Sequence, residues 1–296
     1  MIIIDKNKTR VGFAGLGLMG NALVHRLADG GWNLRVWNRS PQRTEEFKNR
    51  GMAVDPTPAE LAANADLIMS SLANDQAALE VYLGMDGIFT KAKSGSIILE
   101  MSTLSPQVSL VLHAKAKDMG IHLLDIPIAG STPAVKAGTI TLLAGGSKEV
   151  FDACVPLFET IAKQWFLMGP AGSGAQMKLV VNLLLGVGMQ AIAESVSLGE
   201  SLGIDRNTLL SVLSKTAVIG PAFVGKFDKI QKGDYSPQFP LRLMHKDLGL
   251  VLKEAHKTGI ALPAAAAAHQ VTGEIVKDKG DLDLSAITPW VARKKV

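Results

Sequence analysis

The stretch Val11-Gly-Phe-Ala-Gly-Leu-Gly-Leu-Met-Gly20 lies near the start of the 296-residue chain and decides its fold. An apolar run of strand length leads into the spacing Gly-x-Gly-x-x-Gly and then into a helical pattern over residues 21–29. Strand, turn and helix in this order are typical of a dinucleotide-binding unit. Gly15 permits the tight turn, Gly17 lets the backbone approach a pyrophosphate, and Gly20 allows close helix packing.

The residues after the next strand pattern, Leu34–Trp37, indicate which dinucleotide is bound. An acid at this place would hydrogen-bond the ribose 2′-hydroxyl of NAD, but the chain continues with Asn38, Arg39 and Ser40. The planar guanidinium of Arg39 suits a 2′-phosphate, with Arg43 as a second cation. The sequence therefore predicts NADP(H) as cofactor. The expected contacts are Gly15, Leu16, Gly17, Leu18, Met19, Gly20, Asn38, Arg39 and Ser40.

Short apolar runs alternate with helical patterns from about residue 10 to residue 168, which predicts an α/β domain with a mainly parallel, doubly wound sheet. Most runs are apolar throughout, as in strands that are covered on both faces. The expected strands are Val11–Ala14, Leu34–Trp37, Asp66–Ser70, Ser96–Glu100, His122–Ile126, Ile140–Ala144 and Trp165–Met168.

Strand patterns disappear after the glycine-rich segment 169–174, and helical patterns take over. We therefore predict a Rossmann domain over residues 1–170 and an all-helical domain over residues 171–296, joined by a long interdomain helix from about Ala175 to Leu202. Gly203 ends this helix and Asp205 caps the next one. Further helices are expected at Arg206–Thr216, Ala222–Gln231, Leu241–Thr258 and Pro263–Lys277.

Composition favours a packed soluble enzyme, because 47% of residues are hydrophobic and 20% charged. The net charge is +4, but the basic residues are scattered, which argues against a nucleic-acid partner. The one basic cluster, Arg293-Lys294-Lys295, is expected to be a solvated tail. The single cysteine, Cys154, and the dispersed histidines predict neither a disulfide nor a metal site.

The chain is expected to be cytoplasmic. The apolar run at residues 1–6 is far shorter than that of a signal peptide. The most apolar long stretch, Leu179–Leu198, contains Asn182, Gln190 and Glu194, which would be costly in lipid. It predicts a buried helix inside the protein.

Lys178 and Asn182 stand four residues apart at the start of the long helix, so they share one helix face. A lysine beside a bound carbonyl can donate its proton to the oxygen as hydride reaches the carbon, while Asn182 positions the lysine or the substrate. Spacing alone favours a solvated surface lysine, which is the commonest place for this residue.

Five blocks of sequence, in this order along the chain, resemble those of the β-hydroxyacid dehydrogenase family. Within the family, the chain is most similar to the glyoxylate and succinic semialdehyde reductases, with 3-hydroxyisobutyrate dehydrogenase and tartronate semialdehyde reductase as relatives. The residues that carry this likeness are Trp37–Ser40, Gly130-Ser131 and Phe239–Leu241. The blocks are Gly15–Gly20, Met101–Pro106, Asp125–Ser131, Gly172–Asn182 and Lys246–Leu248.

The resemblance implies an oxidoreductase in which Lys178 is the general acid in reduction, with Asn182 as its companion. It implies that Ser102 and Thr103 lie between nicotinamide and substrate. It also implies that the backbone of Gly130 and Ser131 receives a substrate carboxylate.

In the helical half, the resemblance implies that Lys246 and Asp247 close the pocket and that Phe239 is an apolar wall. Lys246 and Thr103 are also expected to contact the cofactor. The expected substrate is a small carboxylate-bearing aldehyde or hydroxy acid.

One departure from the family is Ala129, where a serine is usual, so one hydroxyl on the substrate side is missing. The imine-reducing members of the family lack a lysine at position 178, so this chain resembles them less. Three alternatives remain: a 3-hydroxyisobutyrate dehydrogenase, a tartronate semialdehyde reductase, and a nucleotide-binding scaffold without turnover. By analogy with relatives, a homodimer or homotetramer is expected.

Overall fold

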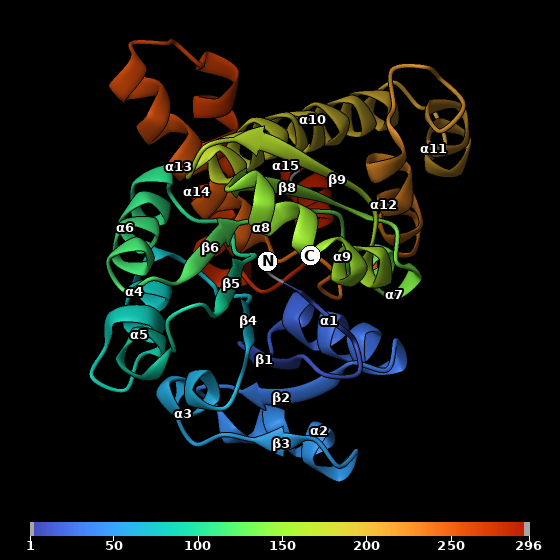
Figure 1. The fold of residues 1–296 in the computed structure, drawn as a ribbon. Helices are drawn as coiled ribbons and strands as arrows, with labels where there is room; N and C mark the ends of the chain where they lie inside the picture. Colours follow the sequence, from blue (N-terminus) through green and yellow to red (C-terminus); the bar gives the residue numbers. More distant parts are fainter. Residues whose placement is uncertain (1–2, 293–296) are drawn as a thin grey trace. The chain divides into compact units, whose positions relative to one another are not determined.

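The computed structural model describes residues 3–292 and divides into two compact units, with the division between Lys178 and Leu179 (Figure 1). The basic cluster Arg293-Lys294-Lys295 lies outside the described residues. The predicted fold class, a Rossmann sheet followed by a helical unit, is confirmed.

The first unit is built on a sheet with the order β3-β2-β1-β4-β5-β6-β8-β7, and β9 pairs with β8. Strands β1 to β6 pair in parallel with one another, whereas β8 is antiparallel to both β6 and β7. The strands are β1 (Arg10–Ala14), β2 (Asn33–Trp37), β3 (Ala53–Val54), β4 (Leu67–Ser70), β5 (Ile97–Glu100), β6 (His122–Asp125), β7 (Ile128–Ala129), β8 (Ile140–Gly146) and β9 (Ala162–Gly169).

All seven predicted strands are present within a few residues of their predicted limits. Two further strands, β3 and β7, have two residues each and were not predicted. A two-residue strand is too short to show an alternating pattern, and its pairing depends on a neighbour that is distant in sequence.

Alternate residues of the central strands enter two separate cores. In β4, Leu67 and Met69 pack with α1, α8 and α9 on one face, whereas Ile68 packs with α3 to α6 on the other. Burial on both faces explains why these strands read as continuous apolar runs. The helices of this unit are α1 (Leu18–Asp29), α2 (Glu45–Asn49), α3 (Pro58–Ala63), α4 (Asp75–Leu83), α5 (Ile88–Lys91), α6 (Pro106–Asp118), α7 (Thr132–Ala137), α8 (Lys148–Ala153) and α9 (Val155–Ile161), with a 3₁₀ turn, η1 (Pro41–Thr44).

The second unit is helical and has its own core, which includes Met189, Val196, Phe227, Met244 and Leu248. As predicted, Gly203 adopts a left-handed conformation with φ of 84° after the long helix, and the side chain of Asp205 caps the next helix by accepting from the N–H of Thr208. Its helices are α10 (Ser173–Ser201), which begins in the first unit, α11 (Arg206–Leu213), α12 (Pro221–Lys232), α13 (Leu241–Thr258), α14 (Pro263–Lys279) and α15 (Ile287–Val291), with a 3₁₀ turn, η2 (Leu284–Ala286).

The prediction that the apolar stretch in α10 is buried is wrong for one face of the helix. By length and composition α10 could cross a membrane, yet only 44% of its most apolar window is buried. Leu184 and Leu198 are 71% and 60% exposed, whereas Asn182 and Met189 are buried. The exposed Leu184 and Leu198 are as apolar as the buried Met189, so the hydrophobic period could not separate the exposed face of α10 from the buried one.

A buried ion pair organises the helical unit. Asp283 is fully buried and accepts from Lys226 Nζ at 2.8 Å and from the backbone N–H groups of Gln238 and Phe239 at 2.9 and 3.0 Å. Burial alone would raise the pKa of Asp283, but the charge and hydrogen bonds of these partners lower it below its ordinary value. One carboxylate thereby fixes the segment that leads into α13.

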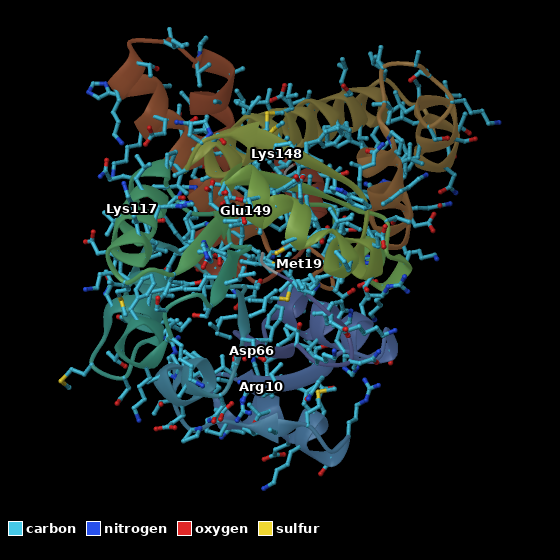
Figure 2. The ribbon with its side chains drawn as sticks, viewed as in Figure 1. Arg10, Met19, Asp66, Lys117, Lys148 and Glu149 are labelled. Carbon is cyan, nitrogen blue, oxygen red and sulfur yellow. The ribbon has the colours of Figure 1, made fainter. Side chains whose placement is uncertain are left out.

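We predict that Lys226→Met destabilises the protein by about 3–5 kcal/mol, because it leaves a buried carboxylate without its cation. Urea unfolding followed by fluorescence measures the change. The control is Lys148→Met at the exposed start of α8 (Figure 2), where Lys148 pairs with Asp152 at 2.6 Å; it should change stability by less than about 1 kcal/mol. Equal effects in the two variants would contradict the assigned role of the buried pair.

Candidate active site

The glycine loop after β1 has the shape that a bound pyrophosphate needs. Gly15 has φ of 97° and donates its N–H to the carbonyl of Trp37 at 2.9 Å. A Cβ on Gly20 would stand 1.9 Å from the oxygen of Gly15, so α1 could not pack here with any larger residue. A Cβ on Gly17 would meet only Arg43 Nη1, at 4.0 Å, so the space beside the start of α1 is open.

The residues after β2 divide into two kinds. Asn38 supports the glycine loop, because its Oδ1 accepts from the N–H of Leu16 at 2.8 Å and its Nδ2 donates to the carbonyl of Ser40 at 3.0 Å. Arg39 and Ser40 are exposed at the end of the strand. Of the remaining loop residues, Leu16 is buried, Leu18 is 43% exposed and Met19 packs partly against the core (Figure 2).

The loops that follow β1, β4 and β5 lie against one another. A Cβ on Gly15 would stand 2.4 Å from the carbonyl oxygen of Ser71, and the N–H of Leu72 donates to Ser102 Oγ at 2.7 Å. Thr103 follows on the same loop. The structure thus brings the predicted Ser102 and Thr103 to the edge of the sheet that carries the glycine loop, where doubly wound sheets bind their ligands.

A buried carboxylate that the sequence analysis did not single out supports this edge. Glu100 Oε1 accepts from the N–H of Ser102 at 2.6 Å, and Oε2 accepts from Ser70 Oγ, which also bonds Tyr82. Burial raises the pKa of Glu100, against the opposite effect of these hydrogen bonds. Burial, and then the nearby charge of Glu100, also raise the pKa of Tyr82 well above its usual value. The sequence feature that could have revealed this buried acid is its place at the end of an otherwise apolar strand, Ile97–Glu100.

The predicted carboxylate loop follows β6 and β7. Gly130 has φ of 154°, and a Cβ there would stand 2.8 Å from Ile140 Cγ2, so no larger residue fits without strain. Ser131 precedes the first turn of α7. Ala129 lies in β7 opposite Thr141, where its small side chain is half-buried.

Lys178 is the last residue of the first unit and is 8% exposed, so it is not a solvated surface lysine. One helical turn later, Asn182 belongs to the second unit, where it is 1% exposed and donates to Asp247 Oδ2 at 2.6 Å. Lys246 Nζ lies 2.9 Å from Asp247 Oδ1. The helical unit therefore brings together three of the residues predicted from sequence.

Phe239 is the remaining predicted site residue. Its side chain is half-buried and packs against the core of the helical unit, and its N–H is held by Asp283. The position of this predicted apolar wall therefore depends on a buried carboxylate more than 40 residues away in sequence.

Comparison with known proteins identifies the family of both units. Residues 10–169 match the family model of the NAD-binding domain of 6-phosphogluconate dehydrogenase, and residues 172–291 match that of the NAD-binding domain of NADP-dependent 3-hydroxyisobutyrate dehydrogenase. The chain is 33% identical over 278 residues to glyoxylate/succinic semialdehyde reductase 1 of Arabidopsis thaliana, covering 94% of this chain and 96% of the relative.

The chain belongs to the β-hydroxyacid dehydrogenase family.

Other members of the family are also similar to this chain over most of its length. Mitochondrial 3-hydroxyisobutyrate dehydrogenase of Mus musculus is 33% identical over 272 residues, covering 90% of this chain and 81% of the relative. The crystal structure of 3-hydroxyisobutyrate dehydrogenase from Salmonella typhimurium superimposes with a TM-score of 0.88 at 25% identity, covering 96% and 100% of the two chains. The predicted family and the predicted oxidoreductase class are confirmed, and the matched domains are NAD(P)-binding domains.

The buried carboxyl group of Glu100 makes the stability of this β-hydroxyacid dehydrogenase depend on pH. Because the pKa of Glu100 is raised in the folded state, the stabilising contribution of this group is complete below about pH 4.5, its ordinary pKa, and is lost as the pH rises through the folded pKa. Gln can accept from Ser102 and donate to Ser70 without a charge. We therefore expect the free energy of unfolding of Glu100→Gln to exceed that of wild type at pH 8, with a difference that shrinks towards pH 5.

Urea unfolding at several pH values between 5 and 8 measures this difference. Glu80→Gln, at an exposed position on α4, is the matched control and should give a pH-independent difference. A flat difference for Glu100→Gln as well would contradict the role given to burial.

Proposed function

We propose that this β-hydroxyacid dehydrogenase uses NADPH to reduce small carboxylate-bearing aldehydes of the glyoxylate and succinic semialdehyde type, with Lys178 as the general acid. The observation that carries the proposal is the burial of the Lys178 side chain at 8% exposure on the second turn of α10. Lysine is rarely buried without a function or a partner. The relatives named glyoxylate/succinic semialdehyde reductase support the substrate class.

Bound NADPH would supply a hydride to the carbonyl carbon. In the proposed step the Lys178 ammonium donates a proton to the carbonyl oxygen as negative charge develops there, and an alcohol is formed. Gly130 and Ser131 hold the substrate carboxylate through backbone N–H groups, and Ser102 and Thr103 contact substrate and nicotinamide. The proposed substrate-binding and catalytic residues also include Asn182, Lys246, Asp247 and Phe239. The alternative substrates are 3-hydroxyisobutyrate and tartronate semialdehyde.

The preference for NADP(H) rests on Arg39, which is exposed at the end of β2 where no acid is present. The open space beside Gly17 fits the pyrophosphate, and the N-terminus of α1 favours its charge. In this arrangement Arg39 and Ser40 bind the 2′-phosphate, while Asn38 holds the loop in place.

We further propose a domain boundary at residues 170/171, a cytoplasmic location and a homo-oligomer, a dimer or a tetramer. Light scattering of the purified protein tests the oligomeric state, and a monomer at micromolar concentration would overturn that part.

The proposed activity is tested by a screen with glyoxylate, succinic semialdehyde, methylglyoxal and tartronate semialdehyde, each with NADPH and with NADH. Loss of nicotinamide absorbance with a carboxylate-bearing aldehyde is expected. Nucleotide binding without turnover across the whole panel would instead identify a binding scaffold.

We predict that Lys178→Ala lowers kcat by about 10²- to 10⁴-fold, the usual contribution of a positioned general acid. The Kd for NADPH should change less than about twofold, because the glycine loop is distant from α10 in sequence and binds the pyrophosphate through its own backbone. Lys163→Ala, at an exposed position on β9, is the matched control and should leave kcat unchanged. A near-wild-type rate in Lys178→Ala would remove the lysine from the mechanism.

We predict that Arg39→Ala lowers kcat/KM for NADPH by roughly 10- to 100-fold, which corresponds to the loss of a charge-assisted contact worth about 1.5–3 kcal/mol. The value for NADH, which lacks the 2′-phosphate, is the internal control and should stay within a factor of two. Equal losses with both cofactors would show that Arg39 acts on the loop rather than on the phosphate.

A further inference from the structure

The carboxylate of Asp125, at the end of β6, caps the long helix that carries Lys178. Its Oδ1 accepts from the N–H of Gly172 and its Oδ2 from the N–H of Ala175, each at 2.8 Å. Gly172 directly precedes α10 and Ala175 lies in its first turn, where N–H groups have no partner within the helix. A negative charge at this end also complements the helix dipole.

A third donor fixes the carboxylate itself. His113 Nε2, from α6, lies 2.7 Å from Asp125 Oδ1. An ionised carboxylate only accepts hydrogen bonds, so the proton of this contact lies on the imidazole. The side chains of His113 and Asp125 are 12% and 3% exposed, so the three donors hold the carboxylate in a site that water scarcely reaches.

The first turn of α10 is also packed against the sheet with no room for side chains. A Cβ on Gly174 would stand 2.3 Å from the carbonyl oxygen of Leu143 and 2.4 Å from that of Asp125. A Cβ on Gly145 would stand 2.6 Å from Asp125 Oδ1 and 2.7 Å from the nitrogen of Gly174. The start of the helix therefore lies directly on β6 and β8, and the Asp125 carboxylate lies within that junction.

We propose that Asp125 is a positioning residue that fixes the Lys178 amine relative to the cofactor-binding sheet. Lys178 follows Ala175 by three residues, less than one helical turn, so the capped turn sets where its side chain begins. Along the chain, the loop of Gly130 and Ser131 follows five residues after Asp125, beyond the short strand β7. Proton donor and carboxylate loop thereby share one anchor. This inference rests on the proposed role of Lys178.

Asp125→Asn tests the anchor with little change of shape. Whichever way the amide is turned, its NH₂ faces the N–H of Ala175 or the N–H groups of Gly172 and His113, so a donor opposes a donor. We expect kcat for glyoxylate, expressed per NADPH-binding site, to fall roughly tenfold, as for a barrier increase of about 1.4 kcal/mol. The Kd for NADPH and the number of binding sites should stay at wild-type values.

Amide hydrogen exchange gives a readout that does not depend on activity. In Asp125→Asn, exchange should accelerate over residues 172–178 and stay unchanged over residues 15–20. The matched control is Asp152→Asn on α8, an exposed carboxylate paired with Lys148; it should alter neither exchange in α10 nor kcat.

If Asp125 had a purely structural role, Asp125→Asn would lower the number of NADPH-binding sites and the total rate in proportion. The kcat per site would then stay at the wild-type value, and this result would overturn the proposal. If Asp125→Asn does not fold, His113→Ala, which removes one of three donors, should lower kcat per site about two- to fivefold, and His113→Gln should restore it. A wild-type kcat per site in His113→Ala would also overturn it.

Failure of the proposed function gives a different pattern. If Lys178→Ala turns over glyoxylate as fast as wild type, the proton donor is misassigned. If Lys178→Ala is slow and Asp125→Asn is fast, the lysine is correct and the anchor is wrong.

Discussion

The contact that joins the sheet to the long helix α10 is the one between the Asp125 carboxylate and the start of that helix. It joins the end of a sheet strand to a 29-residue helix through two charge-assisted hydrogen bonds. Glycines at positions 145 and 174 let the backbones approach closely enough for these bonds to form. A reacting lysine is useful only if its distance from the hydride donor is fixed. The Asp125 contact therefore connects the sheet with the helix that carries the proposed proton donor, Lys178.

Three buried carboxylates show how surroundings, rather than residue type, decide what an acid does. Asp283 has a lysine and backbone donors, so its pKa lies below the ordinary value and its charge organises the helical unit. Glu100 has hydroxyl and backbone partners but no cation, and burial raises its pKa. Asp125 has three N–H donors and holds a helix. All three lie at or beside strand ends or turns, where backbone N–H groups are unpaired.

Much of the fold could be predicted because its signals are local. Most of the seven predicted strands are continuous apolar runs, and Leu241–Thr258 was predicted with its observed limits because its hydrophobic period is regular. The glycine loop needed only the local rule for Gly15, Gly17 and Gly20. In contrast, β3 and β7 exist because a longer strand lies beside them. The exposed face of α10 could not be found by period alone, since both faces are apolar.

The sequence by itself determined the order of strands and helices, the glycine loop, the arginine after β2 and the family blocks that include Lys178 and Asn182, because each is encoded in neighbouring residues. Only the tertiary structure decided that Asn38 holds the glycine loop, that Glu100 supports Ser102 and that Asp125 caps α10. Two of these contacts join separate chain segments through a polar side chain: Leu16 lies 22 residues from Asn38, and the Asp125 partners lie 47 and 50 residues away. A buried acceptor takes whichever donors the fold places beside it, and sequence spacing carries no record of that choice.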